Sequence, residues 1–246
     1  MTLTVPDGAG RGHLVVPGSR DAAEVIHGDL RARILSGDVP AGSELSQTGV
    51  ARDYRVSRGP VREAFRLLQR DGLIAAQVNQ RARVATLSID EVEHLYALRV
   101  ANETMALAVS VPRFSVAELD ELDRMVADVE AAEPGGFALW EERHHRFHMG
   151  LVRHGGARML GSIRQWAEHT ARYRRIYIGD DGWSLGSREH PLLVAHCRSR
   201  DVTAATTLLA RHLSRAALSL IATMDPAHEP ALLRAAIRQV VPAGDR

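Results

Sequence analysis

The chain has 246 residues, 31 basic and 30 acidic side chains, and a formal net charge of +1. This balance excludes a polycationic protein that coats nucleic acid through charge alone. The single cysteine, Cys197, excludes a disulfide framework and a cysteine-based zinc finger and indicates a cytoplasmic protein, and no apolar stretch approaches the roughly 18 residues of a membrane span.

The first third of the chain predicts three helices and a two-stranded wing. Residues 1–20 are rich in glycine and proline and predict a disordered tail. Three segments then carry apolar residues at helical spacing between turn residues, and we expect helices at 21–35, 46–54 and 57–70. Two short strands are expected at 73–76 and 83–85. These elements form one predicted domain, residues 21–86.

The remainder predicts an all-α antiparallel helical bundle over residues 87–224. Two of its helices open with Ser-x-x-Glu capping boxes, at Ser88 and Ser115. The expected helices are 88–111, 115–132, 140–154, 158–178, 187–199 and 201–223. A C-terminal tail, 225–246, follows with room for one short helix at 232–241. The fold class is therefore mainly α, with an N-terminal winged helix-turn-helix pattern.

The third predicted helix carries a ladder of arginines. Arg58, Arg62 and Arg66 are spaced i, i+4, i+8 and share one face. Between Ser46 and Arg70 there are six arginines against two acidic residues. Guanidinium groups and a helix N-terminus both suit phosphate, and arginine also pairs with guanine. From charge alone an ordinary solvated face is an equally good interpretation.

This region resembles the winged helix-turn-helix of GntR-family bacterial transcription regulators, through the strings VSRGPVREA at 56–64 and LLQRDGLI at 67–74. The resemblance implies binding to a double-stranded DNA operator. With the neighbouring arginines and the wing, the candidate DNA contacts are Arg52, Ser57, Arg58, Gly59, Arg62, Arg66, Asn79 and Arg81. Two departures stand out: Thr48 lies where the family often has arginine or glutamate, and Arg81 replaces a wing glycine, so its side chain could enter a minor groove.

Four histidines in the second part could form a metal site. His144 and His148 lie four residues apart on one helix, so their imidazoles share a face. His190 begins the next-to-last helix, and His212 lies midway along the last. Antiparallel packing could bring all four to one depth, whereas His145 should point about 100° away. The alternative is a set of scattered surface histidines.

Residues 89–223 resemble the FCD-type effector domain of the FadR subfamily, notably through Leu98-Arg99-x-x-x-Glu103, Phe147-His148 and Glu189-His190. In metal-binding members of that group one aspartate and three histidines hold a divalent cation. The resemblance implies His148, His190 and His212 as ligands and puts His144 at the aspartate position. Four imidazoles would favour zinc, with nickel, copper or cobalt as alternatives, over manganese or magnesium. Such a site should also be sensitive to acid. Three histidines plus water, or no metal, remain open.

The resemblance further implies a homodimeric repressor on a palindromic operator, with a small organic-acid effector that completes the metal coordination. Arg99, and more weakly Arg172 and Arg175, are candidate effector contacts; the alternative for Arg99 is an ion pair with Glu103. A metal-free, acyl-CoA-responsive regulator of the same family is one alternative function. A histidine-ligated metalloenzyme is another, but the sequence lacks a His-Glu-x-x-His motif, and we expect no enzyme.

Overall fold

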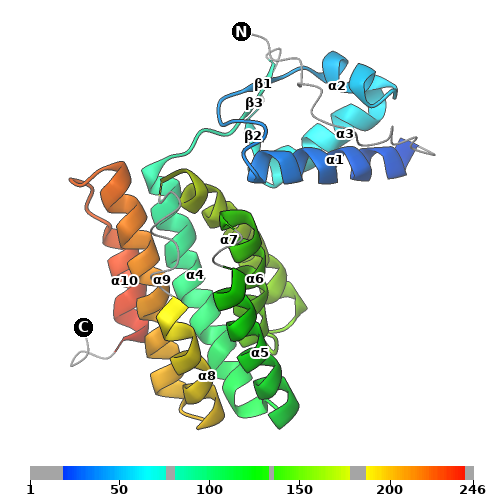
Figure 1. Ribbon diagram of the computed structural model, residues 1–246. Coiled ribbons are helices and arrows are strands. Elements are labelled where there is room, and N and C mark those ends of the chain that lie inside the picture. Colours follow the sequence, from blue (N-terminus) through cyan, green and yellow to red (C-terminus); the bar gives the residue numbers. More distant parts are fainter. Residues whose placement is uncertain (1–18, 76–80, 133–135, 178–186, 242–246) are drawn as a thin grey trace. The chain divides into compact units, whose positions relative to one another are not determined.

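The computed structural model describes residues 19–75, 81–132, 136–177 and 187–241 (Figure 1). The chain divides into two compact units, Met1–Leu87 and Ser88–Arg246. The sequence places its domain boundary one residue earlier, between residues 86 and 87. Most of the predicted N-terminal tail and the wing residue Asn79 lie outside the described residues.

The first unit contains three helices and a small antiparallel sheet. The helices are α1 (Ser19–Leu35), α2 (Gln47–Asp53) and α3 (Arg58–Arg70), and the strands are β1 (Glu44–Leu45), β2 (Ile74–Ala75) and β3 (Ala82–Val84). The strand order is β1-β3-β2. The prediction of a two-stranded wing was incomplete, because β1 was not expected. Its two residues carry no strand pattern of their own and are ordered by pairing with β3, Glu44 opposite Arg83.

The core of the first unit lies where α1 and α3 pack together. It is built from the apolar faces predicted for both helices, including Ile26, Leu30, Val61, Phe65 and Leu68, each at most 2% exposed. Burying these side chains stabilises the unit and leaves the opposite face of α3 in solvent. Ser57 occupies the N-cap position of α3, but its side chain accepts no capping hydrogen bond.

The second unit is an all-α bundle, which confirms the predicted fold class. Its helices are α4 (Ile89–Ser110), α5 (Val116–Ala132), α6 (Phe137–Leu151), α7 (Ala157–Tyr177), α8 (His190–Arg198), α9 (Val202–Met224) and α10 (Ala231–Val240), with 3₁₀ turns η1 (Val111–Arg113) and η3 (Ser187–Glu189). Helix α4 packs against α7, α9 and α10, and α5 packs against α6 and α8 (Figure 1). None of the described helices is both long and apolar enough to cross a membrane.

Both predicted capping boxes stand at helix starts. The Ser88 hydroxyl accepts a hydrogen bond from the Glu91 N–H at 3.1 Å. At the start of α5 the exchange is reciprocal: the Ser115 N–H donates to Glu118 at 2.8 Å, and the Glu118 N–H donates to the Ser115 hydroxyl at 3.2 Å. These bonds satisfy backbone donors that the first turn of a helix leaves without partners.

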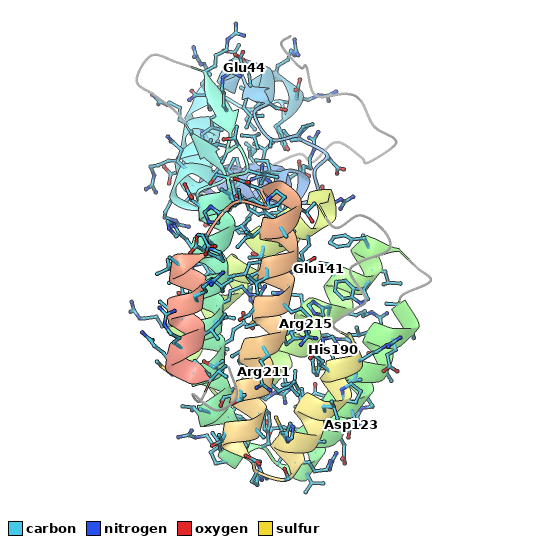
Figure 2. The ribbon with its side chains drawn as sticks, turned by 90° about the vertical axis from the view of Figure 1, so that its left-hand side faces the viewer. Glu44, Asp123, Glu141, His190, Arg211 and Arg215 are labelled. Atoms are coloured by element: carbon cyan, nitrogen blue, oxygen red, sulfur yellow. The ribbon has the colours of Figure 1, made fainter. Side chains whose placement is uncertain are left out.

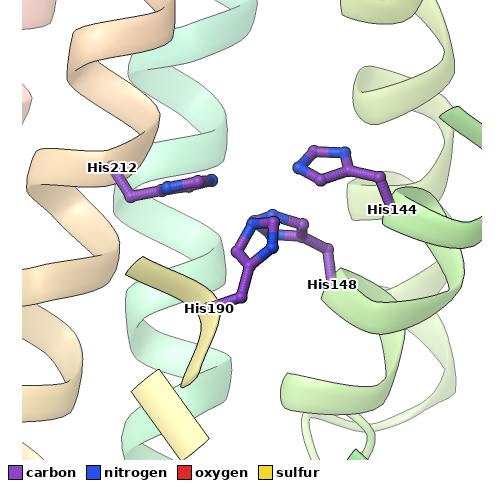
Figure 3. Close-up of side chains that lie close together, drawn as sticks. All are labelled: His144, His148, His190 and His212. Carbon is purple, nitrogen blue, oxygen red and sulfur yellow. The ribbon is translucent and has the colours of Figure 1, made fainter. Parts of the chain in front are cut away.

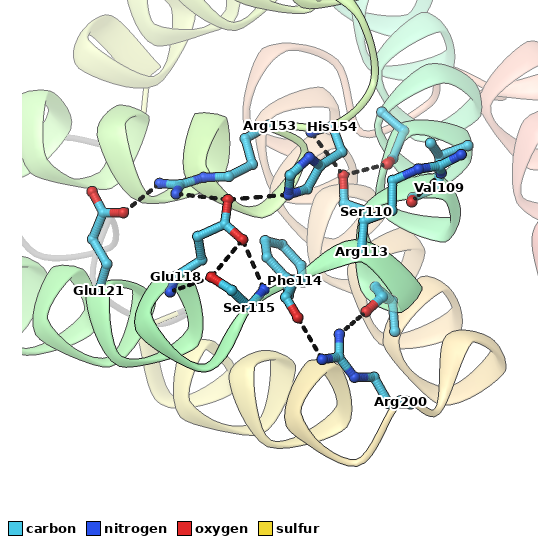
Figure 4. A network of polar contacts seen from close by, with 12 residues as sticks. Val109, Ser110, Arg113, Phe114, Ser115, Glu118, Glu121, Arg153, His154 and Arg200 are labelled. Carbon is cyan, nitrogen blue, oxygen red and sulfur yellow. Dashed lines mark hydrogen bonds and ion pairs between the residues drawn. The ribbon is translucent and has the colours of Figure 1, made fainter.

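The capping carboxylate of Glu118 also joins α5 to the end of α6. It lies 3.4 Å from Arg153 and 3.2 Å from His154 (Figure 4). On the other side of the same network, Arg200 donates to the carbonyls of Val111 and Phe114 and so ties the start of α9 to η1. The ends of four elements are thereby fixed to one another at this end of the bundle.

The segment that the sequence assigned to a C-terminal tail contains α10, which belongs to the second unit. Leu233 of α10 is completely buried. Because Pro230 at its N-cap makes no side-chain capping bond, the first turn relies on Glu93 of α4, which accepts from the N–H groups of Leu232 and Leu233 at 2.6 and 3.2 Å. The predicted helix at 232–241 differs from α10 by one residue at each end.

Candidate metal centre and DNA-contact face

The four predicted histidines come together inside the second unit. His144 and His148 extend from α6, His190 is the first residue of α8, and His212 lies on α9. One nitrogen from each ring lies within 4.8 Å of the others, and all four side chains are buried. Figure 3 shows the rings turned toward a common centre between the helices. The alternative of scattered surface histidines is therefore wrong.

The spacing and bonding of these rings fit a transition-metal ion. In a tetrahedral site with zinc–nitrogen bonds of about 2.0–2.1 Å the donor nitrogens lie about 3.3–3.4 Å apart, so rings whose nitrogens lie within 4.8 Å of one another would each move inward by up to about 1 Å to bind one ion. Neither ring nitrogen of His148 or His190 has a hydrogen-bond partner among the described residues. Because a buried polar group without a partner costs about 1–3 kcal/mol, a bound ion would remove a penalty that these rings otherwise carry.

Three of the histidines, His144, His148 and His190, are held in the neutral form that binds metal. Burial lowers the pKa of His148 to about 4, with the nearby His212 adding to the effect against the opposing pull of Glu103. Burial likewise lowers the pKa of His144 and of His190. Neutral imidazole is the ligand species, so these three rings are ready to coordinate at neutral pH without losing a proton first.

Two carboxylates lie next to histidine rings of the cluster. Oε2 of Glu189 lies 3.0 Å from Nδ1 of His212, and Oε2 of Glu103 lies 3.6 Å from Nδ1 of His148. Burial by itself would raise the pKa of Glu103, but Arg99 and His148 outweigh it and lower that pKa to about 2. A carboxylate hydrogen-bonded to one nitrogen of an imidazole, as Glu189 is to His212, orients the ring and leaves the other nitrogen for a metal.

Trp140, one turn earlier on α6, fixes the orientation of His144. The two rings are stacked, with centroids 4.3 Å apart and an angle of 16° between their planes. His145, by contrast, is half-buried and outside the cluster, as the helical geometry predicts. The contact of Trp140 with His144 was not predicted, although their i, i+4 spacing permits it.

The candidate effector arginines lie in different environments. Arg99 is 2% exposed, forms an ion pair with Glu103 at 2.6 Å and donates to the Thr170 hydroxyl at 2.8 Å, so the ion pair considered from the sequence is present. Arg172 is buried, and Arg175 is exposed near the end of α7. Their assignment to an effector stays a prediction.

A further buried arginine, Arg174, was not predicted. It is 5% exposed, forms an ion pair with Glu141 of α6 and donates to the Tyr96 hydroxyl at 3.1 Å. Burial opposes its charge, yet the neighbouring Glu141 carboxylate keeps the pKa of Arg174 above its ordinary value. No sequence signal marks this pair, because Glu141 and Arg174 lie on separate helices that only the tertiary fold brings together.

The predicted DNA contacts lie on the outside of the first unit. Every one of them that falls within the described residues is exposed: Arg52, Ser57, Arg58, Gly59, Arg62, Arg66 and Arg81. The α3 arginines lie opposite the buried stripe of that helix, so packing of the core presents them to solvent. Asn79 cannot be placed with them, because residues 76–80 are not described.

Acidic neighbours hold several of these arginines in the unbound protein. Arg66 pairs with Glu63 at 2.6 Å, and Arg81 pairs with Glu44 at 3.1 Å. Glu44, labelled in Figure 2, also pairs with Arg83, and these arginines lower the pKa of its carboxyl group. The pairs lie at the surface and are therefore weak enough for DNA phosphates to replace.

Comparison with known protein families agrees with this two-part organisation. Residues 22–84 match the family described as bacterial regulatory proteins of the gntR family, and residues 94–215 match the FCD domain. The first match falls within the first compact unit and the second within the unit that holds the histidine cluster.

Individual proteins give the same result. The HTH-type transcriptional regulator YdhC of Bacillus subtilis is 26% identical over 193 residues, which cover 77% of this chain and 86% of YdhC. The HTH-type transcriptional repressor GlaR of Escherichia coli is 28% identical over 196 residues, which cover 75% of this chain and 89% of GlaR. A regulator of Agrobacterium vitis is 30% identical, with 47% of this chain and 72% of that protein covered.

Solved structures share the fold. Escherichia coli McbR/YncC superposes with a TM-score of 0.70 at 18% identity, covering 83% of this chain and 99% of that one. A GntR regulator from Rhodococcus sp. RHA1 gives a TM-score of 0.67 at 20% identity, covering 84% and 99% of the two chains. At these identities the likeness establishes the architecture only.

Proposed function

Because this chain belongs to the GntR family of bacterial transcription regulators and carries an FCD domain, we propose that it is a ligand-responsive repressor that holds a divalent transition metal in its second unit. Its matches are to transcription regulators rather than enzymes, and several relatives are named as repressors. The observation that carries the sensor part of the proposal is the buried cluster of four histidines within the FCD region.

We assign the first unit to an operator. Arg58, Arg62 and Arg66 would face the major groove, where arginine reads guanine or grips phosphate, and Gly59 near the helix start permits close backbone approach. Arg81 would bring a guanidinium to the wing contact. A palindromic operator has two-fold symmetry and is matched by two symmetric copies of the protein. We therefore propose that the chain binds DNA as a homodimer.

We assign the metal to His144, His148, His190 and His212, with zinc preferred because all donors are imidazoles. When bound, the ion supplies a Lewis-acidic position for an anionic oxygen of a small carboxylate effector. Glu189 would orient the His212 imidazole through its hydrogen bond, and Trp140 would hold the His144 ring by stacking. The burial of all four histidines would keep water away from the ion. An effector would shift the equilibrium only through different affinities for the DNA-binding and released states.

Elemental analysis of untagged protein tests the metal assignment. We expect about one equivalent of zinc or a similar ion per chain, a large loss in a His148→Ala variant, and no loss in the matched His145→Ala variant, whose ring lies on the same helix outside the cluster. A trace of metal far below one equivalent, or unchanged content after His148→Ala, would overturn it.

DNA footprinting tests the regulator assignment separately. Sequence-specific protection is expected upstream of the protein's own coding region or at a neighbouring promoter, and Arg62→Ala should weaken it by about 1–3 kcal/mol. An absence of specific protection at all such sites would contradict the operator proposal whatever the metal content.

A further inference from the structure

The fixed charges around the histidine cluster balance one another. Among the described residues, three carboxylates near the cluster form ion pairs with arginines. The pairs are Glu103 with Arg99 at 2.6 Å, Glu189 with Arg215 at 2.7 Å, and Glu141 with Arg174. Before any ion binds, these six side chains together contribute no net charge.

The four donors add no negative charge either. A histidine that coordinates a metal does so as neutral imidazole. The loaded centre would therefore carry the full +2 of a divalent ion, whereas a carboxylate at position 144 would reduce it to +1. All four histidines are buried, at most 6% exposed. In such surroundings an uncompensated charge is strongly unfavourable, so the loaded centre should favour a ligand that neutralises it.

Arg174 offers a second point of attachment. Its Nε–H is buried and has no hydrogen-bond acceptor among the described residues, although the other nitrogens of its guanidinium contact Glu141, Tyr96 and Thr170. Its ion-pair partner Glu141 lies on α6 three residues before His144, and so on the same helix as this ligand. An unused buried donor thus lies beside the end of the cluster that His144 occupies.

From this arrangement we infer that the effector is a small dianion, such as a dicarboxylate, with one anionic group on the ion and the other directed toward Arg174. The inference rests on the proposed metal site and narrows its ligand from carboxylates in general to those with two negative charges. The second negative charge is needed on the effector because position 144 holds a neutral histidine and not an anionic aspartate.

Two probes that differ by one charge test the inference. Zinc-loaded protein, dialysed to remove free metal, is titrated by calorimetry at fixed ionic strength with malonate and with its monomethyl ester. We expect malonate to bind at least about ten times more tightly, since a ten-fold ratio corresponds to 1.4 kcal/mol and one buried charge interaction exceeds this. Metal-free protein should lose most of the preference.

Two isosteric variants supply the matched comparison. His144→Asn keeps the donor neutral and should retain the preference for malonate, whereas His144→Asp adds one negative charge and should lower the malonate-to-ester ratio about ten-fold. Equal ratios in zinc-loaded wild type, His144→Asn and His144→Asp would overturn the dianion inference and leave the metal proposal intact.

The zinc content, measured first, separates the two proposals. Wild-type protein that binds neither zinc nor a similar divalent transition-metal ion defeats the metal proposal and this inference with it. Zinc-loaded wild type that binds both probes equally defeats this inference alone. Because the wild-type comparison needs no variant, failure of either variant to fold or to retain zinc does not remove the test.

Discussion

Glu44 holds two arginines of the wing at once, Arg81 and Arg83. In the unbound protein this carboxylate keeps both guanidinium groups near the sheet, in competition with any phosphate. Since Glu44 itself is not a candidate DNA contact, its effect on binding should come through the arginines that it restrains.

Glu44→Gln should therefore tighten DNA binding and make it more dependent on salt. With Arg81 released, about one more phosphate contact becomes available, so the slope of log K against log salt should steepen by about one unit. Fluorescence anisotropy with an operator fragment at several salt concentrations measures both the affinity for DNA and its dependence on salt. Asp38→Asn removes the same charge from an exposed position after α1 and is the control. Equal effects of the two variants would show that general charge, not Arg81, is responsible.

Gly155 marks a close approach of two segments in the second unit. A Cβ at this position would lie 2.8 Å from Cβ of Ala106 and 3.1 Å from the Val152 carbonyl oxygen. Neither neighbour is the end of a flexible side chain, so the backbone would have to move.

Gly155→Ala should lower the free energy of unfolding by about 1–3 kcal/mol. The matched variant is Gly161→Ala, where a Cβ meets nothing within 4 Å inside α7. There the added methyl group should stabilise the helix by about 0.5–1 kcal/mol. Urea unfolding of both variants measures the change in the free energy of unfolding, which should have opposite signs in the two. Destabilisation of similar size in both variants would contradict the steric explanation.

At the scale of whole elements, α10 depends on a cap supplied by another helix. Glu93 of α4 accepts from two backbone N–H groups of α10 and lies 2.7 Å from His228. Burial by itself would raise the pKa of Glu93, but His228 and the two backbone donors outweigh it, so the pKa is lowered in the folded state. A lowered pKa means that the folded protein prefers the ionised form.

The contribution of Glu93 to stability should be complete at neutral pH and be lost as the pH falls. Because its folded-state pKa lies below the ordinary value of 4.5, the loss begins near that value and continues through the folded-state pKa. Glu93→Gln should lower unfolding free energy by about 1–2 kcal/mol at pH 7 and by less below pH 4.

Hydrogen exchange over residues 231–240 localises this effect, since the amides of α10 should exchange faster in Glu93→Gln at pH 7. Glu229→Gln, which removes an exposed carboxylate that pairs with exposed Arg234 at 3.2 Å, should change stability by less than about 0.5 kcal/mol. A pH-independent difference between Glu93→Gln and wild type would argue against an ionised cap.

Elements that are stabilised by contacts between neighbouring residues could be predicted from the sequence, and elements that depend on distant residues could not. The capping box at Ser115 was confirmed because both partners lie within one turn. At Ser88 only the bond to the serine hydroxyl forms, because the Ser88 N–H donates to Tyr173 of α7 instead of to Glu91. By contrast, β1 exists only through pairing with β3, and the cap of α10 comes from Glu93, far away in the sequence. In both cases the two partners are too far apart in the sequence for a local pattern to reveal the contact.

At the scale of the whole chain, each compact unit has its own core, and the histidine cluster belongs to the second alone. A metal that binds the folded cluster but not the unfolded chain should stabilise only that unit. At a free concentration one hundred times its dissociation constant, the stabilisation is about 2.7 kcal/mol.

Removal of the metal by a chelator should therefore lower the melting temperature of one transition and leave the other in place. Differential scanning calorimetry with and without zinc measures this. His190→Ala should abolish the zinc-dependent shift, and His145→Ala should preserve it, since only the former ring belongs to the cluster. A shift of both transitions, or a shift that survives His190→Ala, would contradict a single site in the second unit.

The site itself was predictable in part. The spacing of His144 and His148 on one helix has a direct geometric meaning, and the family resemblance supplied His190 and His212. The side chains that orient and balance the cluster were not predicted in those roles. Glu189 contacts His212 across a gap in sequence, and Arg174 finds Glu141 on another helix, so both depend on how the bundle packs.

The spread of the four histidines along the chain also sets an order of events during synthesis. The first unit ends at Leu87, whereas the last histidine of the cluster is residue 212. Since domains fold as units and the N-terminal one emerges first, a growing chain can complete its DNA-binding unit before its cluster exists. Each newly made molecule can thus fold the unit that we propose to contact the operator before the histidines of the proposed metal site come together.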